Sequence, residues 1–148
     1  MKNSQLYSNG SFISDIQYYQ QAILDNIPYM AWLKDIEGRY LMANKPFTSY
    51  FKIKISDLLG KKDSEVFPEG ISVMHEQYDR SVIKTGKKKF FEDEWIIDGN
   101  SSWLETFLNP VYDDHKNLVG ITGISIDITD RKAMEETIRF AVLDVFEK

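Results

Sequence analysis

The chain has 148 residues, 43% of them hydrophobic and 14% aromatic, which suits one sizeable buried core rather than two. A net charge of -5 argues against binding nucleic acid, and the absence of cysteine excludes disulfides and thiolate catalysis. No apolar run approaches the roughly 20 residues needed to cross a bilayer. We therefore expect no membrane insertion and a cytoplasmic location, with which the lack of cysteine is consistent.

The N-terminal part predicts a tail and one amphipathic helix. Residues 1–11 are mostly polar, and we expect them to be disordered. Residues 12–27 carry isoleucines at helical spacing and end before Pro28, which cannot continue a helix. These isoleucines are Ile13, Ile16, Ile23 and Ile27.

A hairpin and a short helix are expected next. Residues 29–34 and 39–43 are apolar and aromatic runs separated by a turn-like segment, which is typical of two paired strands. Asn44 can accept backbone N–H bonds as an N-cap, and Pro46 suits the first turn of the following helix.

The middle of the chain is predicted to be helical but interrupted. Ser56 is expected to cap a short turn that ends at Gly60, and a second turn ends at Pro68. A longer helix then runs to Gly86, a favourable residue at a helix C-terminus. The apolar stripe expected on this helix is Ile71, Met74, Tyr78 and Val82.

Three strands and a final helix complete the pattern. Strands are expected over residues 90–97, 103–112 and 118–128, with a turn at residues 98–100 between the first two. A helix is expected over residues 129–148. This order indicates an α+β fold with an antiparallel sheet and helices crossing one face.

Several sequence pieces, in this order, resemble the PAS sensory family from about Ile23 to Lys132. They are Lys34–Tyr40 with Asn44, Asp79–Val82 with Thr85–Lys87, Asp98-Gly99, Trp103–Thr106 leading to Pro110, and Gly120–Lys132. The resemblance implies a PAS core over residues 28–128, with a five-stranded sheet around a small internal cavity. It also implies that the flanking helices, residues 12–27 and 129–148, join this core to an output domain.

Strand alternation and the resemblance together select candidate ligand-binding residues. Alternate residues of a strand share one face, and the resemblance places Leu104, Thr106 and Leu108 toward the cavity. The outward residues Trp103 and Phe107 are expected under the N-terminal helix or a second subunit. The full ligand-binding set is Trp32, Lys34, Phe47, Phe51, Met74, Tyr78, Glu92, Glu94, Leu104, Thr106, Leu108, Ile121, Gly123 and Ser125.

The acidic strand Phe91–Trp95 leaves two registers open. Either Glu92 and Glu94 face inward, or Asp93 does. A buried carboxylate needs a cationic or hydrogen-bonding partner, for which Lys34 and a polar or cationic ligand are the candidates. A plain internal salt bridge, or a carboxylate that reaches solvent at the rim, is the simpler alternative.

No cofactor is assigned from the sequence. The absence of cysteine excludes the flavin-cysteine photochemistry known in this family. His75 precedes Gly86 by eleven residues and matches the axial position of the family's haem sensors, so a haem-binding gas or redox sensor stays an alternative. The bulky, acidic strand opposite argues against haem.

No enzyme or metal-binding motif in the sequence is complete. The segment His75–Asp79 has Asp79 where a zinc-protease helix carries its second histidine, so no metal site is predicted and a solvated face is expected. A phosphate loop, a nucleophile elbow and a kinase loop set are all missing. We expect a segment that is not an enzyme.

The last helix carries the expected output. Thr129 is expected to cap it, and Asp127 with Thr129 forms the predicted hinge of signal transmission. Its residues Met134, Ile138, Ala141 and Val145 recur at four-three-four spacing. The chain is expected to dimerise through the N-terminal helix, the C-terminal helix or both, although a C-terminal helix folded back on its own sheet explains the pattern equally.

These observations predict a sensory module of a bacterial signalling protein, such as a histidine kinase or diguanylate cyclase. A small molecule would bind in the cavity and shift the C-terminal helix, which transmits the signal to an output domain. The alternative is a ligand-free PAS module that acts only in dimerisation or protein-protein interaction.

Overall fold

The computed structural model describes residues 10–147, which form one antiparallel sheet and six helices within that range. The order along the chain is α1 Gly10–Asn26, β1 Met30–Asp35, β2 Tyr40–Ala43, α2 Lys45–Phe51, α3 Ile55–Leu58, α4 Asp63–Val66, α5 Glu69–Thr85, β3 Lys89–Ile97, β4 Asn100–Tyr112, β5 Leu118–Asp127 and α6 Thr129–Glu147.

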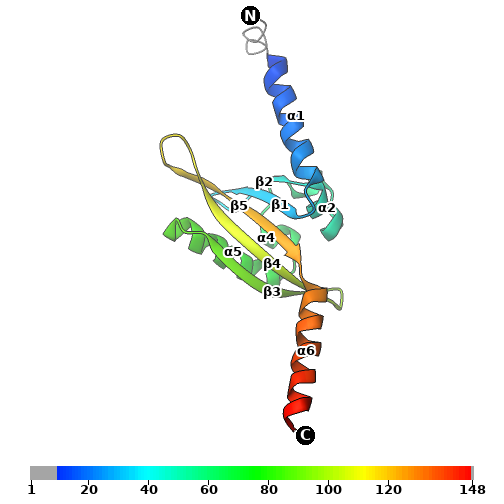
Figure 1. The fold of residues 1–148 in the computed structure, drawn as a ribbon. Helices are drawn as coiled ribbons and strands as arrows, with labels where there is room; N and C mark the ends of the chain where they lie inside the picture. Colours follow the sequence, from blue (N-terminus) through cyan, green and yellow to red (C-terminus); the bar gives the residue numbers. More distant parts are fainter. Residues whose placement is uncertain (1–9, 148) are drawn as a thin grey trace, which may run out of the picture.

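The five strands are arranged in the order β2-β1-β5-β4-β3, and all neighbouring strands are antiparallel. The helices between β2 and β3 lie against one face of this sheet (Figure 1). The core lies between that face and these helices, and the predicted α+β class is confirmed. Because β5 is the central strand, its inward side chains lie in the middle of the core.

Strand alternation places side chains as predicted on β4 and β5. Leu104, Thr106 and Leu108 are at most 1% exposed, and Ile121 and Ser125 are also buried. The hydroxyls of Thr106 and Ser125 lie 2.6 Å apart, so these two inward polar groups satisfy each other.

Asn44 connects three elements at the start of the core. Its side chain accepts hydrogen bonds from the backbone N–H groups of Ala31 and Phe47 and donates to the carbonyls of Leu24 and Tyr29. The predicted N-cap is therefore confirmed. The same amide also joins α1 to β1, which the sequence pattern did not indicate.

Two details of the helical middle differ from the predictions. Ser56 does not cap α3, because the helix already begins at Ile55 and Lys54 occupies the capping position. On α5 the predicted stripe is wrong at Met74, which is 39% exposed. The buried face is instead Ser72, His75, Asp79 and Val82.

The physical reason for the rotated face of α5 is polar pairing. Two of its four buried residues are ionisable, and both find partners inside the domain, as described below. A pattern based on apolar residues alone therefore selects the neighbouring face. The expectation that His75–Asp79 is a solvated face is wrong for the same reason.

The terminal helices project from the core in opposite directions, α1 at one end and α6 at the other (Figure 1). No described side chain of α6 is buried, so the alternative in which this helix folds back on its own sheet is wrong. The predicted tail, residues 1–11, falls partly outside the described residues, and its last two positions belong to α1.

The outer face of β4 is not covered by α1. The ammonium of Lys132, in the first turns of α6, lies 5.0 Å from the ring centre of Trp103. Phe107 stacks with Phe90 at 4.9 Å and remains 38% exposed. The expectation of a cover by the N-terminal helix is therefore wrong, and a cover by a second subunit stays a prediction.

Candidate functional site

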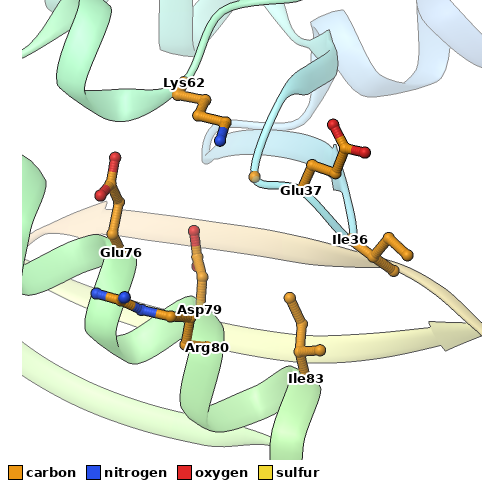
Figure 2. Close-up of a pocket in the computed structure, with 8 residues that line it drawn as sticks. Ile36, Glu37, Lys62, Glu76, Asp79, Arg80 and Ile83 are labelled. Atoms are coloured by element: carbon orange, nitrogen blue, oxygen red, sulfur yellow. The ribbon is translucent and has the colours of Figure 1, made fainter.

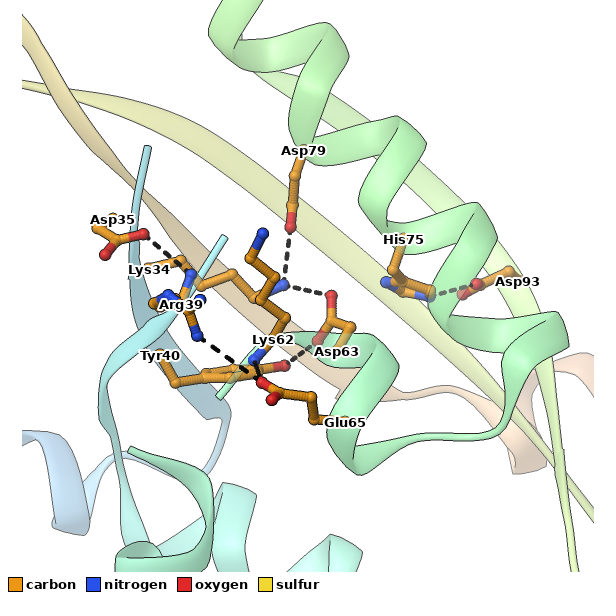
Figure 3. A network of polar contacts seen from close by, with 10 residues as sticks. All are labelled: Lys34, Asp35, Arg39, Tyr40, Lys62, Asp63, Glu65, His75, Asp79 and Asp93. Carbon is orange, nitrogen blue, oxygen red and sulfur yellow. Dashed lines mark hydrogen bonds and ion pairs between the residues drawn. The ribbon is translucent and has the colours of Figure 1, made fainter. Parts of the chain in front are cut away.

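Lys34 on β1 is the centre of a buried ionic network. Its side chain is 3% exposed, and its ammonium donates to Asp63 at 2.6 Å and to Asp79 at 2.7 Å. The other oxygen of Asp63 accepts the Tyr40 hydroxyl at 2.6 Å. Figure 3 shows that α4 and α5 each contribute one carboxylate to the same lysine from β1.

One ammonium faces two carboxylates in this network, so one negative charge is not balanced by its neighbours. Burial would lower the pKa of Lys34, but Asp63 and Asp79 outweigh it and raise the pKa above its usual value. Burial raises the pKa of Asp79, and Lys34 only partly offsets this. Burial and Asp63 raise the pKa of Tyr40 well above its usual value, so its hydroxyl remains a donor.

A second buried pair joins α5 to β3. Nε2 of His75 lies 2.8 Å from Oδ2 of Asp93, and the indole N–H of Trp95 donates to Oδ1 of the same carboxylate at 3.2 Å. The imidazole packs edge-on against the rings of Trp95 and Phe91. Asp93 is thus the inward acid of the acidic strand.

The register with Glu92 and Glu94 inward, from which both were assigned to the ligand site, is wrong. These two residues lie on the outer face of β3, because the alternating positions 91 and 95 bury large aromatic rings. Glu92 instead forms ion pairs with Arg131 and Lys132 of α6. The ion pairs of Lys34 are with Asp63 of α4 and Asp79 of α5, and none is with this strand among the described residues.

A small cavity lies beside both polar networks. Its volume open to the centre of a water molecule is about 20 Å³, which is enough for about one water. Its lining comprises Trp32, Lys34, Tyr40, Phe47, Phe51, Asp63, His75, Asp79, Trp95 and Ser125. Nε1 of Trp32 is buried there without a hydrogen-bond partner among the described residues.

An unpaired buried N–H is unusual, because it forfeits its hydrogen bond to water. The position of Trp32 is fixed by Gly123 on the neighbouring strand, where any Cβ would overlap the indole ring. The glycine therefore contributes space rather than a functional group. Within the described residues, the indole N–H is thus an unpaired donor on a residue that lines the cavity.

Five predicted ligand-binding residues line this cavity: Trp32, Lys34, Phe47, Phe51 and Ser125. Leu104, Thr106, Leu108, Ile121 and Gly123 are buried around it without lining it, and Tyr78 packs on Phe91 at 4.0 Å. Met74 points away from it, so this assignment is wrong.

Sequence reasoning missed Tyr40, Asp63, Asp79 and Trp95 as residues of the cavity, and it left Asp93 as one of two open registers. The signal for Asp79 was its position four residues after His75, on the face that also carries Val82. Asp63 offered no comparable signal, because it is the first residue of a helix of only four residues.

The geometry does not fit a haem. Asp93 already engages Nε2 of His75, and the cavity beside it has room for about one water rather than a porphyrin. Within residues 10–147, no group of three His, Cys, Asp or Glu side chains could hold a metal ion.

The junction between β5 and α6 has its own set of hydrogen bonds. Oδ1 of Asp127 accepts the backbone N–H of Thr129 at 2.8 Å, and Oδ2 accepts the Tyr50 hydroxyl at 2.8 Å. The Thr129 hydroxyl accepts the backbone N–H of Trp103 at 2.9 Å. Thr129 therefore ties β4 to the helix start rather than capping the helix, which corrects the predicted cap.

Burial would raise the pKa of Asp127, but the hydrogen bonds from Thr129 and Tyr50 outweigh it and lower the pKa below its usual value. The carboxylate is therefore ionised around neutral pH. Tyr50 is the neighbour of Phe51, which lines the cavity. Of these two adjacent residues of α2, Phe51 thus lines the cavity and Tyr50 bonds the last residue of β5, next to α6.

These features define a class of protein: a single-sheet α+β domain whose helices enclose a polar cavity and whose last strand continues into a projecting helix. A family model described as "PAS fold" matches residues 24–133, most of the chain. The chain belongs to the PAS family.

The similar curated proteins are histidine kinases or a sensor protein. The chain is 29% identical over 116 residues to histidine kinase 5 of Arabidopsis thaliana, covering 77% of this chain and 12% of that protein. It is 26% identical over 112 residues to the methanogenesis regulatory histidine kinase FilI of Methanothrix harundinacea, covering 76% and 13%. The chain thus spans only about an eighth of the length of these relatives. It represents a PAS sensory module of the kind found in histidine kinase signalling.

Solved structures show the same fold. The PAS domain of BvgS from Bordetella pertussis has a TM-score of 0.69 at 24% identity, covering 88% of this chain and 98% of that one. A Vibrio cholerae VqmA dimer has a TM-score of 0.68 at 24% identity, covering 77% of this chain and 52% of that one.

No helix within residues 10–147 is long and apolar enough to span a membrane.

Proposed function

We propose that this PAS module is a sensor that binds a small molecule in the cavity beside Lys34 and transmits the binding through α6 to an output domain. The carrying observation is the indole of Trp32: its ring belongs to the lining of the cavity, and its buried N–H has no hydrogen-bond partner among the described residues. A ligand acceptor would satisfy that donor. The surrounding aromatic rings would cover an apolar ligand body.

The main route of transmission follows β5, which contains both Ser125 and Asp127. Ser125 lines the cavity and Asp127 holds the start of α6, so β5 carries a displacement directly to the junction. Phe51 and Tyr50 of α2 provide a parallel route to the same carboxylate. Asp127 and Thr129 would form the hinge, and a displacement along either route would change their positions.

The small cavity volume favours a second candidate. A core with room for about one water needs to expand before it admits a larger molecule. A ligand-free module that acts through its projecting helices does not need this expansion. In that case the partner of the module would be a second copy, joined through α1, α6 or both, and α6 would remain joined to the output domain.

Both proposals are tested by denaturing the natively purified protein and analysing the released compounds by mass spectrometry. We expect a small compound in a fixed ratio to wild-type protein, and less of it from Trp32→Phe, which lacks the indole N–H. Leu41→Ala, at an exposed position of β2 outside the cavity, is the matched control and should retain the compound. Equal recovery of a compound from Trp32→Phe and wild type would contradict the role of the Trp32 N–H, and no compound from either protein would favour the ligand-free module.

A further inference from the structure

A second pocket opens at the surface next to the buried network, outside the cavity described above. Its volume is about 150 Å³, and its lining comprises Ile36, Glu37, Gly38, Lys62, Glu76, Asp79, Arg80 and Ile83. Figure 2 shows the β1–β2 turn and Lys62 on one side and the side chains of α5 on the other. The pocket thus collects groups from three separate segments.

The pocket contains two cations, Lys62 and Arg80. The ammonium of Lys62 and the guanidinium of Arg80 form no ion pair with any residue between 10 and 147. In Figure 2 the Lys62 side chain extends toward the space above α5. These two cations are available to an anionic group of a ligand, and Arg80 can bind a carboxylate in a bidentate manner.

The floor of the pocket offers the opposite charge. Asp79 lines both this pocket and the internal cavity, and it shares its single cation, Lys34, with Asp63. Its carboxylate is therefore only partly neutralised. Glu76 stands one turn before Arg80 on the same side and has no ion-pair partner within residues 10–147. An ammonium group of a ligand would be attracted to these carboxylates.

The remaining walls are apolar. Ile36 comes from the β1–β2 turn and Ile83 from α5, and both line the same pocket. An aliphatic group of a ligand would cover part of their exposed surface. Cations, carboxylates and an aliphatic patch within one pocket of this size match a small zwitterion better than a singly charged ion.

We infer that this pocket binds a small aliphatic zwitterion, with its ammonium at Asp79 and Glu76 and its carboxylate at Arg80 and Lys62. Such a ligand competes with Lys34 for Asp79 and therefore alters the buried network from outside. The site is separate from the internal cavity, so it adds a second input to the same module. Its existence does not depend on whether the internal cavity holds a compound.

Nuclear magnetic resonance titration of the backbone amides tests this inference, with L-valine, isobutylamine and isobutyrate as probes at millimolar concentration. With L-valine we expect saturable chemical-shift changes at Gly38 and on α5. Isobutylamine and isobutyrate each lack one charge and should bind about tenfold more weakly than L-valine, since the loss of one charge-assisted hydrogen bond lowers the affinity by about that factor. Arg80→Gln should weaken the binding of L-valine by about tenfold and leave the affinity for isobutylamine unchanged.

Lys84→Gln is the matched control, because it removes one exposed cation from the same helix outside the pocket. It should bind L-valine like the wild type. The inference is overturned if none of the three probes gives saturable shifts in the pocket. It is also overturned if isobutylamine binds as tightly as L-valine, or if Arg80→Gln and Lys84→Gln have the same effect.

Discussion

Replacement of Lys34 by methionine is expected to lower the free energy of unfolding by about 3–5 kcal/mol at neutral pH, the usual cost of removing one partner from a buried ionic group. Asp63 and Asp79 would remain buried without their cation. Methionine has a similar length, so the loss would reflect charge rather than a large cavity. Urea unfolding followed by tryptophan fluorescence measures it.

The effect of Lys34→Met should depend on pH in a defined direction. Burial already raises the pKa of Asp79, and without the lysine the opposing effect on this pKa is lost, so folding favours the protonated carboxyl more strongly. A carboxyl with a raised pKa contributes stability below its unfolded pKa of about 4, and this stability is lost as the pH rises through the folded value. The deficit relative to the wild type should therefore shrink on acidification.

Two companion variants of Lys34→Met make the result specific. Lys84→Met removes an exposed lysine of α5 and should change the stability by less than about 0.5 kcal/mol. Adding Asp63→Asn and Asp79→Asn to Lys34→Met should restore part of the loss, because the unpaired charges disappear. A pH-independent loss that the asparagines do not relieve would contradict the ionic account.

Asn44→Ala is expected to cost about 3 kcal/mol of stability, because it leaves several buried backbone groups without partners and removes a helix cap. The side chain is 0% exposed and bonds α1, Tyr29 before β1, β1 itself and α2. We therefore also expect faster hydrogen exchange in the last turns of α1. Chemical unfolding and exchange measured by nuclear magnetic resonance are the readouts.

Asn26→Ala is the matched control for Asn44→Ala. The Asn26 amide donates to the Ala22 carbonyl at 2.7 Å but is exposed, so water can replace it. Asn26→Ala should therefore lower the free energy of unfolding only slightly. Similar costs for the two variants would show that the buried position of Asn44 does not determine its contribution.

The elements and the sheet face of β4 and β5 could be predicted from sequence because local signals agreed with the fold. The cap at Asn44 and the stop at Gly86 are local features, and Gly86 takes the left-handed conformation, with φ 64°, that favours glycine. Alternation on β4 and β5 is equally local.

The polar half of the site could not be predicted because its partners are distant in sequence. Lys34 pairs with residues 29 and 45 positions further along the chain. The apolar pattern assigned Met74 to the buried face of α5. That face is instead determined by His75 and Asp79, which find polar partners inside the domain. In the same way, the register of β3 follows from aromatic burial at positions 91 and 95 rather than from its acids.

The central claim is that a change in the cavity reaches α6 through β5. Two amides report on the junction: that of Trp103, which bonds the Thr129 hydroxyl, and that of Thr129, which bonds Asp127. Ser125→Val changes the cavity wall and breaks the hydroxyl contact with Thr106. Thr122→Val makes the same kind of change on the outer face of the same strand.

The most direct measurement is residue-level hydrogen exchange of these two amides in the wild type and both variants. The account predicts that Ser125→Val accelerates exchange at Trp103 and Thr129 relative to other amides of equal protection, whereas Thr122→Val does not. Unchanged exchange at the junction in Ser125→Val, or equal acceleration by both variants, would contradict transmission from the cavity to α6.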